Sequence, residues 1–231
     1  MESTYVDLFA TKGIEYLLVL GFLPVLALFW RFLNESGYTA PALAMAGSAA
    51  RSVSPWFRLH DGIFYHQGHT WAEPESEDVV RVGIDDFAQK LLGKASMLRL
   101  PEVGTRVEQG ERGLSLAIGE KSIDILSPVG GEIIERNEAV LRTPEIVNAD
   151  PYGSGWLMKV RVPKMESNLK NLLSGTLAGA WMDEAVDGLR TRLSGEMGML
   201  LQDGGVPVAG MARNLSPDGW DEIAKEFLMT L

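Results

Sequence analysis

The chain has no cysteine and only three histidines among its 231 residues. The absence of cysteine excludes disulfide bonds, thiolate zinc sites, iron–sulfur ligation and cysteine nucleophiles together. Basic residues are also scarce, since 21 lysines and arginines stand against 31 acidic residues, for a formal net charge of −10. Nucleic-acid binding needs clustered lysine and arginine to neutralise phosphates, so this composition argues against nucleic acid as a partner.

Motifs of catalysis are missing as well, because the sequence has neither a Gly-x-Ser-x-Gly elbow nor a phosphate-binding loop. The histidines His60, His66 and His69 are close in sequence but lack the i,i+4 spacing of helical metal ligands. On an alternating strand, His60 and His66 would share a face and His69 would lie opposite. The adjacent Asp85 and Asp86 are expected on a solvated face. We therefore expect neither an enzyme nor a metal site.

The longest apolar run covers residues 14–33, with a charged residue near each end. Twenty helical residues at ~1.5 Å each span ~30 Å, the thickness of a bilayer's hydrocarbon layer. The rings of Tyr16 and Trp30 stand near the two ends, where aromatic residues prefer the lipid–water interface. The run predicts a transmembrane helix. A buried core helix is the alternative, and a secretory signal fits less well because residues 1–12 are not basic.

Basic residues are more frequent at the carboxyl side of this run than before it: Arg31 stands near its end, and Arg51 and Arg58 follow. Since such an excess marks the cytoplasmic side, we expect a single-pass protein of the cell (inner) membrane with a cytoplasmic C-terminal domain. Residues 1–13 are then an extramembrane segment. Residues 34–55 are rich in glycine, alanine and serine, which indicates a linker.

Residues 56–175 carry patterns typical of a β domain. Residues 79–83 alternate between apolar and polar like a half-buried strand. A short helix is predicted next, with Asp85 as its N-cap and Gly93 at its end. Residues 97–100 then predict another strand.

A β-hairpin is predicted from two apolar segments, residues 114–118 and 123–126, joined by a polar turn at residues 119–122. The string Asn-x-Asp-Pro-Tyr-Gly-x-Gly-Trp at residues 148–156 predicts a further turn that leads into a strand.

Three strings of the sequence resemble the H-protein of the glycine cleavage system, a carrier with a lipoyl group on a lysine. Residues 64–71 resemble the family's Tyr-x-x-x-His-Glu-Trp, residues 127–132 its Ala-Pro-Val-Ser-Gly-Glu, and residues 148–156 its most specific motif. The match runs without a gap over residues 83–160. It implies a mainly β fold with α additions, an H-protein-like flattened β-barrel or sandwich (a barrel-sandwich hybrid) of two antiparallel sheets.

The resemblance places the family's lipoyl-lysine position at Glu120, one residue before Lys121. A shift of one residue in a strand or tight turn points a side chain to the other face, so a lipoate ligase should handle Lys121 poorly. Lys121 can still be lipoylated if Gly119 lets the turn change register, because glycine accepts positive φ. Otherwise Lys121 is an ordinary exposed lysine. The second interpretation is preferred here, and no cofactor is expected.

Residues 176–231 extend beyond the end of the resemblance and predict two helices. Apolar residues recur at helical spacing over residues 177–201, and Ser216 is predicted as the N-cap of a second helix. The apolar stripe of the first helix consists of Leu177, Trp181, Ala185, Leu189, Leu193, Met197 and Leu200. Either both helices pack on each other or on the β domain, or the stripe docks a partner subunit.

The function expected from these features is that of a non-catalytic accessory or scaffold subunit. It would be anchored in the lipid bilayer and would use its H-like domain to dock other subunits of a larger membrane complex, by analogy an electron-transfer assembly. One alternative is a membrane-tethered carrier, lipoylated on Lys121, that shuttles acyl groups, aminomethyl groups or reducing equivalents. Another is a regulator that binds a lipoate ligase or a lipoyl-dependent enzyme by mimicry.

Overall fold

The computed structural model describes residues 20–26, 51–54, 56–196 and 209–230. The chain divides into two compact units, Met1–Gly47 and Ser48–Leu231. The division falls within the predicted linker. The finer domain limits expected at residues 13, 33, 55 and 175 stay predictions.

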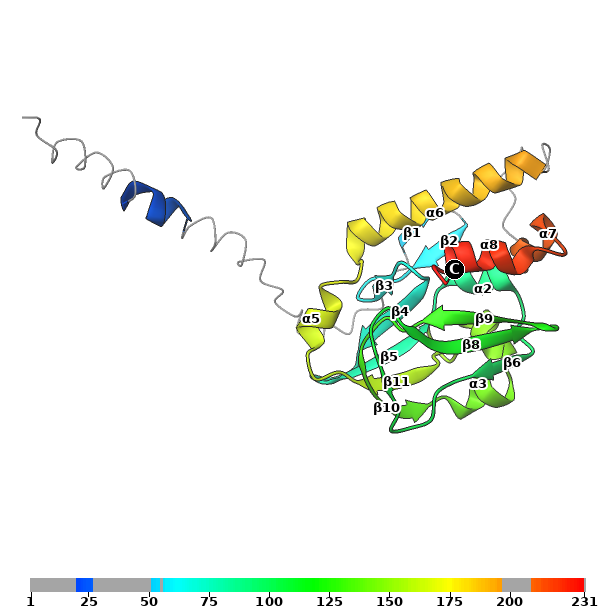
Figure 1. Ribbon diagram of the computed structural model, residues 1–231, viewed down its shortest axis with the longest axis horizontal. Helices are drawn as coiled ribbons and strands as arrows, with labels where there is room; N and C mark the ends of the chain where they lie inside the picture. The colour runs from blue at the N-terminus through cyan, green and yellow to red at the C-terminus, as the bar shows by residue number, and fades with distance from the viewer. Residues whose placement is uncertain (1–19, 27–50, 55, 197–208, 231) are drawn as a thin grey trace, which may run out of the picture. The chain divides into compact units, whose positions relative to one another are not determined.

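Most strands of the second unit form a six-stranded antiparallel sheet in the order β3-β4-β5-β11-β10-β7 (Figure 1). Val80 and Val82 of the central strand β5 are fully buried, and Arg81 between them is not. This alternation confirms the strand predicted at residues 79–83. The strands are β3 (Phe64–His66), β4 (Thr70–Pro74), β5 (Val79–Ile84), β7 (Arg106–Val107), β10 (Gly131–Arg136) and β11 (Met158–Arg161).

A three-stranded antiparallel sheet contains β6 (Met97–Arg99), β8 (Arg112–Ile118) and β9 (Lys121–Leu126). Strand β1 (Arg51–Ser54) pairs separately with β2 (Phe57–Leu59). The expected antiparallel sheets are therefore present. In the part of the chain that the structure describes, no strand pairing joins them into the closed, flattened barrel that was expected.

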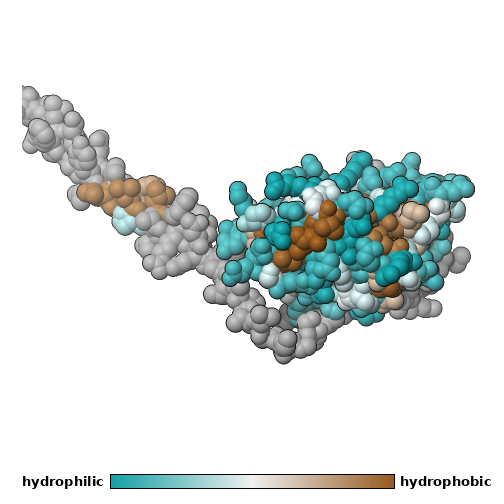
Figure 2. All heavy atoms as spheres, turned by 90° about the horizontal axis from the view of Figure 1, so that it is seen from below, coloured by the Kyte–Doolittle hydropathy of each residue, from teal (hydrophilic) through white to brown (hydrophobic). Residues whose placement is uncertain are grey.

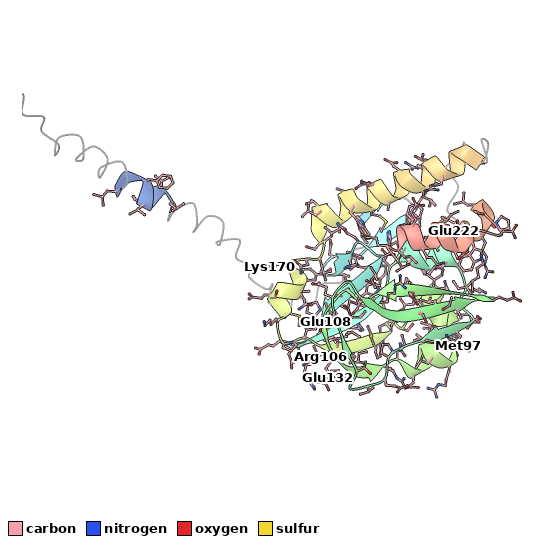
Figure 3. All side chains as sticks on the ribbon, viewed as in Figure 1. Met97, Arg106, Glu108, Glu132, Lys170 and Glu222 are labelled. Atoms are coloured by element: carbon pink, nitrogen blue, oxygen red, sulfur yellow. The ribbon has the colours of Figure 1, made fainter. Side chains whose placement is uncertain are left out.

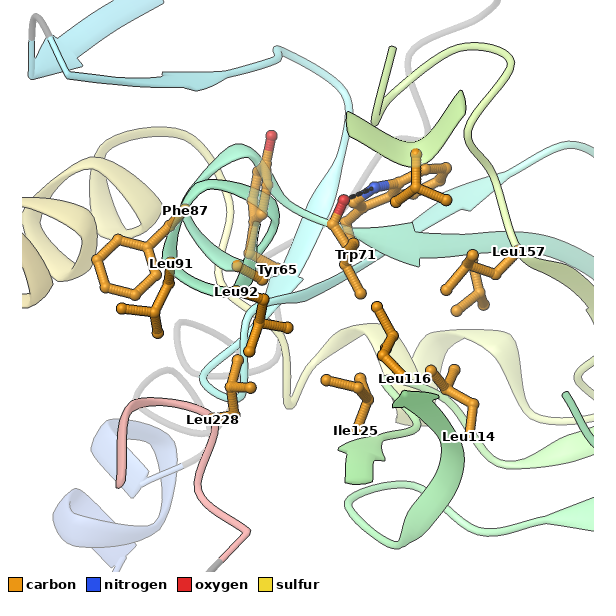
Figure 4. Packing of buried hydrophobic residues seen from close by; sticks show 14 of the residues in the cluster. Tyr65, Trp71, Phe87, Leu91, Leu92, Leu114, Leu116, Ile125, Leu157 and Leu228 are labelled. Carbon is orange, nitrogen blue, oxygen red and sulfur yellow. Dashed lines mark hydrogen bonds between the residues drawn. The ribbon is translucent and has the colours of Figure 1, made fainter. Parts of the chain in front are cut away.

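One hydrophobic core joins the two larger sheets to helix α2 (Asp86–Leu92). Figure 4 shows Trp71, Tyr65 and Phe87 in this core, together with apolar side chains of β8 and β9. The Trp71 indole N–H donates to the carbonyl oxygens of Ile84 at 2.9 Å and Pro151 at 3.2 Å. The largest side chain of the core thus satisfies its polar atom, as burial of an indole requires.

Helix α2 begins and ends where the sequence predicts. The Asp85 carboxylate accepts a hydrogen bond from the backbone N–H of Ala88 at 2.8 Å, as an N-cap should. Gly93 ends the helix with φ 78°, a backbone conformation that glycine adopts readily. Phe87 and Leu91, one turn apart, are both fully buried.

The carboxylates of Asp85 and Asp86 are buried, and the expectation of a solvated face is wrong. His69 Nδ1 lies 2.8 Å from Asp85 Oδ2, and Lys90 Nζ lies 3.0 Å from Asp86 Oδ2. Asp86 also accepts a hydrogen bond from the backbone N–H of Arg58. Each acid is paired, which offsets the cost of removing its charge from water.

The first and third strings of the resemblance form defined local structures. Residues 64–71 form two strands, β3 and β4, separated by a turn in which His69 has φ 60°. Residues 148–156 do form the predicted turn before β11. Its Asn148 side chain donates to the Gly93 carbonyl at 3.1 Å, so this turn is tied to the end of α2. Three short helices were not predicted, α3 (Glu138–Arg142), α4 (Glu145–Ala149) and α5 (Met165–Leu169).

Helix α6 (Gly175–Glu196) is the first helix predicted after the β domain. Among its described side chains, the buried hydrophobic ones are Ala178, Met182, Val186 and Leu189. Leu177, expected in the buried stripe, is 67% exposed, so the packed face is rotated relative to the predicted one. Trp181 is partly buried, and residues 197–201 lie outside the described part.

Two further helices follow, α7 (Met211–Leu215) and α8 (Trp220–Phe227). Helix α7 was not predicted. Ser216 is not the N-cap of α8, because the helix begins at Trp220 with Gly219 at the N-cap. The Ser216 hydroxyl accepts from the Gly219 N–H at 3.1 Å in the preceding turn. Helix α6 packs on β1 and β2, α7 on α2, and α8 on β9 (Figure 1). Within the described residues, the extension therefore packs on the β domain, the first of the two alternatives.

The first unit is described only at residues 20–26, which are helical. Figure 2 shows this segment as a mainly hydrophobic surface. Among the described residues, no helix combines the length and the apolar character needed to cross a membrane. The remainder of the run at residues 14–33 lies outside the described part, so the transmembrane helix stays a prediction. The exposed apolar side chains here are Leu20, Phe22, Leu23, Val25 and Leu26.

Candidate functional site at the tip of the β8–β9 hairpin

The β8–β9 hairpin ends in a turn of two residues, Gly119 and Glu120. Ile118 of β8 pairs directly with Lys121 of β9, so the four-residue turn predicted from sequence is too long. Gly119 has φ 63°, and a short hairpin turn needs such a left-handed residue. Lys121 is therefore the first residue of β9 and belongs to the sheet.

Glu120 and Lys121 differ in what they can bind. Glu120 is exposed at the apex of the turn, and its carboxylate cannot form an amide with another carboxylic acid. Lys121 carries a primary amine and is the only lysine of the sequence between residues 95 and 158. A lipoyl group fits this hairpin through Lys121 and not through Glu120.

The amine of Lys121 is held by three groups that come from the C-terminal end of the chain. Its Nζ donates to the Asp221 carboxylate and to the Asp218 carbonyl oxygen, the latter at 2.5 Å. It also lies 5.8 Å from the centroid of the Trp220 ring, within the range of a cation–π interaction. We call Asp218, Trp220 and Asp221 the lysine clamp. The Lys121 side chain remains 39% exposed within it.

Asp221 is the charged centre of the lysine clamp. Its second oxygen accepts from Lys225 of the same helix at 2.9 Å. The hydrogen bond from Lys121, and next the one from Lys225, lowers the pKa of Asp221 to about 2. Arg213 of α7 lies 5.1 Å from the Trp220 ring centroid. The basic side chains of Lys225 and Arg213 thus flank the clamp.

The helix that carries the clamp is attached to the domain at several points. Trp220 is almost fully buried and Leu228 fully so. Figure 4 shows Leu228 in the same apolar cluster as Leu92 of α2. Glu226 of α8 forms an ion pair with Arg192 of α6 at 2.5 Å.

The three histidines have separate structural roles. The His60 ring packs against the Tyr152 ring in a tilted arrangement, with ring centroids 4.4 Å apart, and the His66 ring accepts from the Gly68 N–H at 3.0 Å. His69 is buried beside Asp85. Burial lowers the pKa of His66. Among the residues that the structure describes, no three His, Asp or Glu side chains converge as metal ligands would.

Sequence reasoning singled out Lys121 and Glu120 but missed the lysine clamp. The spacing of Asp221 and Lys225 is a local signal, because residues four apart meet on one face of a helix. The contact between Lys121 and Asp221 spans 100 residues and has no such signal.

The two antiparallel sheets and the hairpin with a lysine beside its tip define a carrier-type β domain. Comparison with known proteins then identifies its family. A family model described as "Glycine cleavage H-protein" matches residues 63–185, just over half of the chain. The chain belongs to the glycine cleavage H-protein family. A second model, described only as "Protein", matches residues 7–36.

Two relatives, from Thermus thermophilus and Pyrococcus abyssi, agree with this assignment. The glycine cleavage system H protein of Thermus thermophilus is 46% identical over 110 residues, which cover 48% of this chain and 84% of the relative. The probable H protein of Pyrococcus abyssi is 38% identical over 117 residues, covering 51% and 87%. A crystal structure of the H protein from Mycobacterium marinum is 30% identical and covers 55% of this chain and 99% of its own, with a TM-score of 0.48.

The family assignment corrects the expectation that the chain has no cofactor. That expectation depended on Glu120 at the family's lysine position, but members of this family are lipoyl carriers, and this chain keeps a lysine one residue away. H-proteins are carriers and not enzymes, in agreement with the absence of catalytic motifs. The relatives' names place them in the glycine cleavage system and give no support to membrane-complex partners or electron transport.

Proposed function

We propose that this chain is a lipoyl carrier of the glycine cleavage type, with its lipoyl group attached to Nζ of Lys121. The observation that carries the proposal is the position of Lys121, directly after the two-residue hairpin turn of an H-protein domain. Its partners would then be proteins of a glycine cleavage system, as the relatives' names indicate.

The rest of the hairpin suits a fixed point of attachment. Leu116, Ile118, Ile123 and Ile125 are all buried, so both strands are held by the core up to the turn. An arm attached at Lys121 would thus leave the domain from a well-defined position. When bound, lipoate supplies a reversible disulfide that carries a transferred group or a pair of electrons.

Attachment requires one covalent step. The Lys121 amine, after losing the proton of its ammonium form, attacks the carboxyl carbon of an activated lipoyl group. An amide N–C bond forms, the bond to the activating group breaks, and a second amine proton is released. The positive charge of the lysine is lost in this step.

The direct test is the intact mass of the full chain, extracted in detergent from its native membrane or co-expressed with a lipoate ligase and lipoate. We expect one added lipoyl or octanoyl group in the natural protein and in Glu120→Gln, and none in Lys121→Arg. Peptide mapping should place the group on Lys121. An unmodified chain under both conditions would refute the carrier.

We also propose that the apolar run at residues 14–33 anchors the carrier in the cell membrane, with residues 48–231 in the cytoplasm. Support comes from the length of the run and from the exposed apolar side chains of residues 20–26. The basic residues after the run support the orientation.

A further inference from the structure

The lysine clamp lies outside the part of the chain that matches the H-protein family model. The match ends at residue 185, and the clamp residues stand at 218–221. The site of attachment proposed above is therefore covered by an element that is an addition to the family domain. Such a cover limits the access of acylating reagents to the Lys121 amine.

An amine attacks an acyl carbon with its lone pair. The Lys121 ammonium donates to the Asp221 carboxylate and to the Asp218 carbonyl, and in that state it offers no lone pair. The indole of Trp220 covers it further. While these contacts last, the amine is protected from acylation.

We infer that residues 210–230 are a latch that closes over Lys121, and that Asp221 is the positioning residue that holds the latch shut. This inference rests on the proposed function, in which Lys121 is the site of lipoyl attachment. Acylation and closure exclude each other, because the amide of an acylated lysine is neutral and no longer pairs with Asp221.

The latch has a weak part and a strong part. Asp221 and Lys121 keep side-chain exposures of 19% and 39%, and pairs near the surface are weakened by solvent and salt. Trp220 and Leu228 are buried and hold the helix by packing. The ionic clamp can therefore open while α8 stays attached to the domain.

The test is competitive acylation of the full-length, unlipoylated chain with a small N-hydroxysuccinimide ester, quantified at each lysine by peptide mass spectrometry. The exposed Lys170, beside α5 and remote from Glu222 of α8 in Figure 3, is the reference amine. Lys90, which donates to the Trp56 carbonyl at 2.8 Å and pairs with Asp86, reports unfolding of the domain.

We expect Lys121 to react more slowly than Lys170 in the natural protein, and Asp221→Asn to raise its relative rate roughly three- to tenfold. Leu228→Ala should also raise the acylation rate of Lys121, since this substitution loosens the packing of α8 and leaves the charges in place. The control Asp187→Asn removes an exposed ion pair of α6 and should leave the acylation rate of Lys121 unchanged. The acylation rate of Lys90 should stay low in every variant, because the domain remains folded.

The latch is refuted if natural Lys121 already reacts as fast as Lys170, or if Asp221→Asn leaves its rate unchanged. Failure of the carrier proposal would look different. In that case Asp221→Asn would still raise the rate at which Lys121 reacts with the ester. Neither the Asp221→Asn variant nor the natural chain, however, would gain a lipoyl group.

Discussion

At the scale of the residue, Glu120 and Lys121 are neighbours with opposite roles. Glu120 is exposed at the apex of the turn, whereas Lys121 begins β9 and is held by the lysine clamp. The two side chains are not interchangeable, because Glu120 lies in the turn and Lys121 lies in the strand.

The substitution Glu120→Lys should create a second and better attachment site. The new amine would stand at the position that the sequence resemblance assigns to the family's lysine, one residue before the lysine that pairs with Asp221. We expect co-expression with a lipoate ligase to modify position 120 more completely than Lys121, as measured by intact mass and peptide mapping. Equal modification of Glu120→Lys and of the control Glu120→Gln would contradict this expectation.

Trp71 is a second residue whose role can be tested. Trp71→Phe keeps most of the buried ring but leaves the Ile84 and Pro151 carbonyl oxygens without the indole donor. We expect the free energy of unfolding to fall by about 1–3 kcal/mol in urea denaturation. The partly buried Trp156 offers a control, since among the described residues its indole donates no such hydrogen bond, and Trp156→Phe should lower the free energy of unfolding by less.

At the scale of the element, α8 combines a packed face with a charged one. Leu228, just after the helix, is fully buried, and its neighbour Met229 is 53% exposed. Leu228→Ala should lower the free energy of unfolding by about 2–5 kcal/mol, the range for buried leucines. Met229→Ala is the matched control and should stay within about 0.5 kcal/mol. Similar losses in both variants would contradict the packing described for α8.

The charged face of α8 predicts that the stability of the folded domain depends on pH in the acid range. Asp221 has its pKa lowered from 3.8 to about 2 by Lys121 of β9 and Lys225 of its own helix, while Arg213 of α7 lies beyond the Trp220 ring. A lowered pKa gives stability that is present above the ordinary value of 3.8 and lost as pH falls through about 2.

The stability difference between the natural chain and Asp221→Asn should therefore be largest above pH 4 and shrink toward pH 2. Urea midpoints measured across this range give the comparison. A difference that stays constant with pH would show that Asp221 is not paired in the folded state.

At the scale of the whole molecule, the chain consists of two units with different chemistry. The unit Ser48–Leu231 has a core of its own, whereas the described part of Met1–Gly47 is an apolar helical segment with exposed side chains. This contrast fits a folded carrier joined to a membrane anchor.

Removal of residues 1–47 should release the carrier from the membrane without changing its stability. We expect the full chain to resist extraction with alkaline carbonate, and the shortened chain to stay in the soluble fraction with an unchanged thermal midpoint. Extraction of the full chain by carbonate would contradict the anchor. A lowered midpoint of the shortened chain would contradict the independence of the second unit.

Local pattern alone predicted the strand β5, the helix α2 with its cap at Asp85, and the β8–β9 hairpin. Each of these depends on residues within a few positions of one another, through side-chain alternation, capping or turn chemistry. The motif at residues 148–156 likewise indicated its turn and the family. These features follow from short-range sterics and hydrogen bonding, which the sequence contains in full.

Only the tertiary structure decided the two-residue turn that puts Lys121 in the sheet, the burial of Asp85 and Asp86, and the rotated face of α6. The lysine clamp is the clearest case, because Lys121 and Asp221 are 100 residues apart and meet only once α8 packs on β9. A pairing of this kind depends on how separate elements pack, and no local spacing encodes it. The sequence thus placed a single lysine, Lys121, in this hairpin, and the fold decided what covers it.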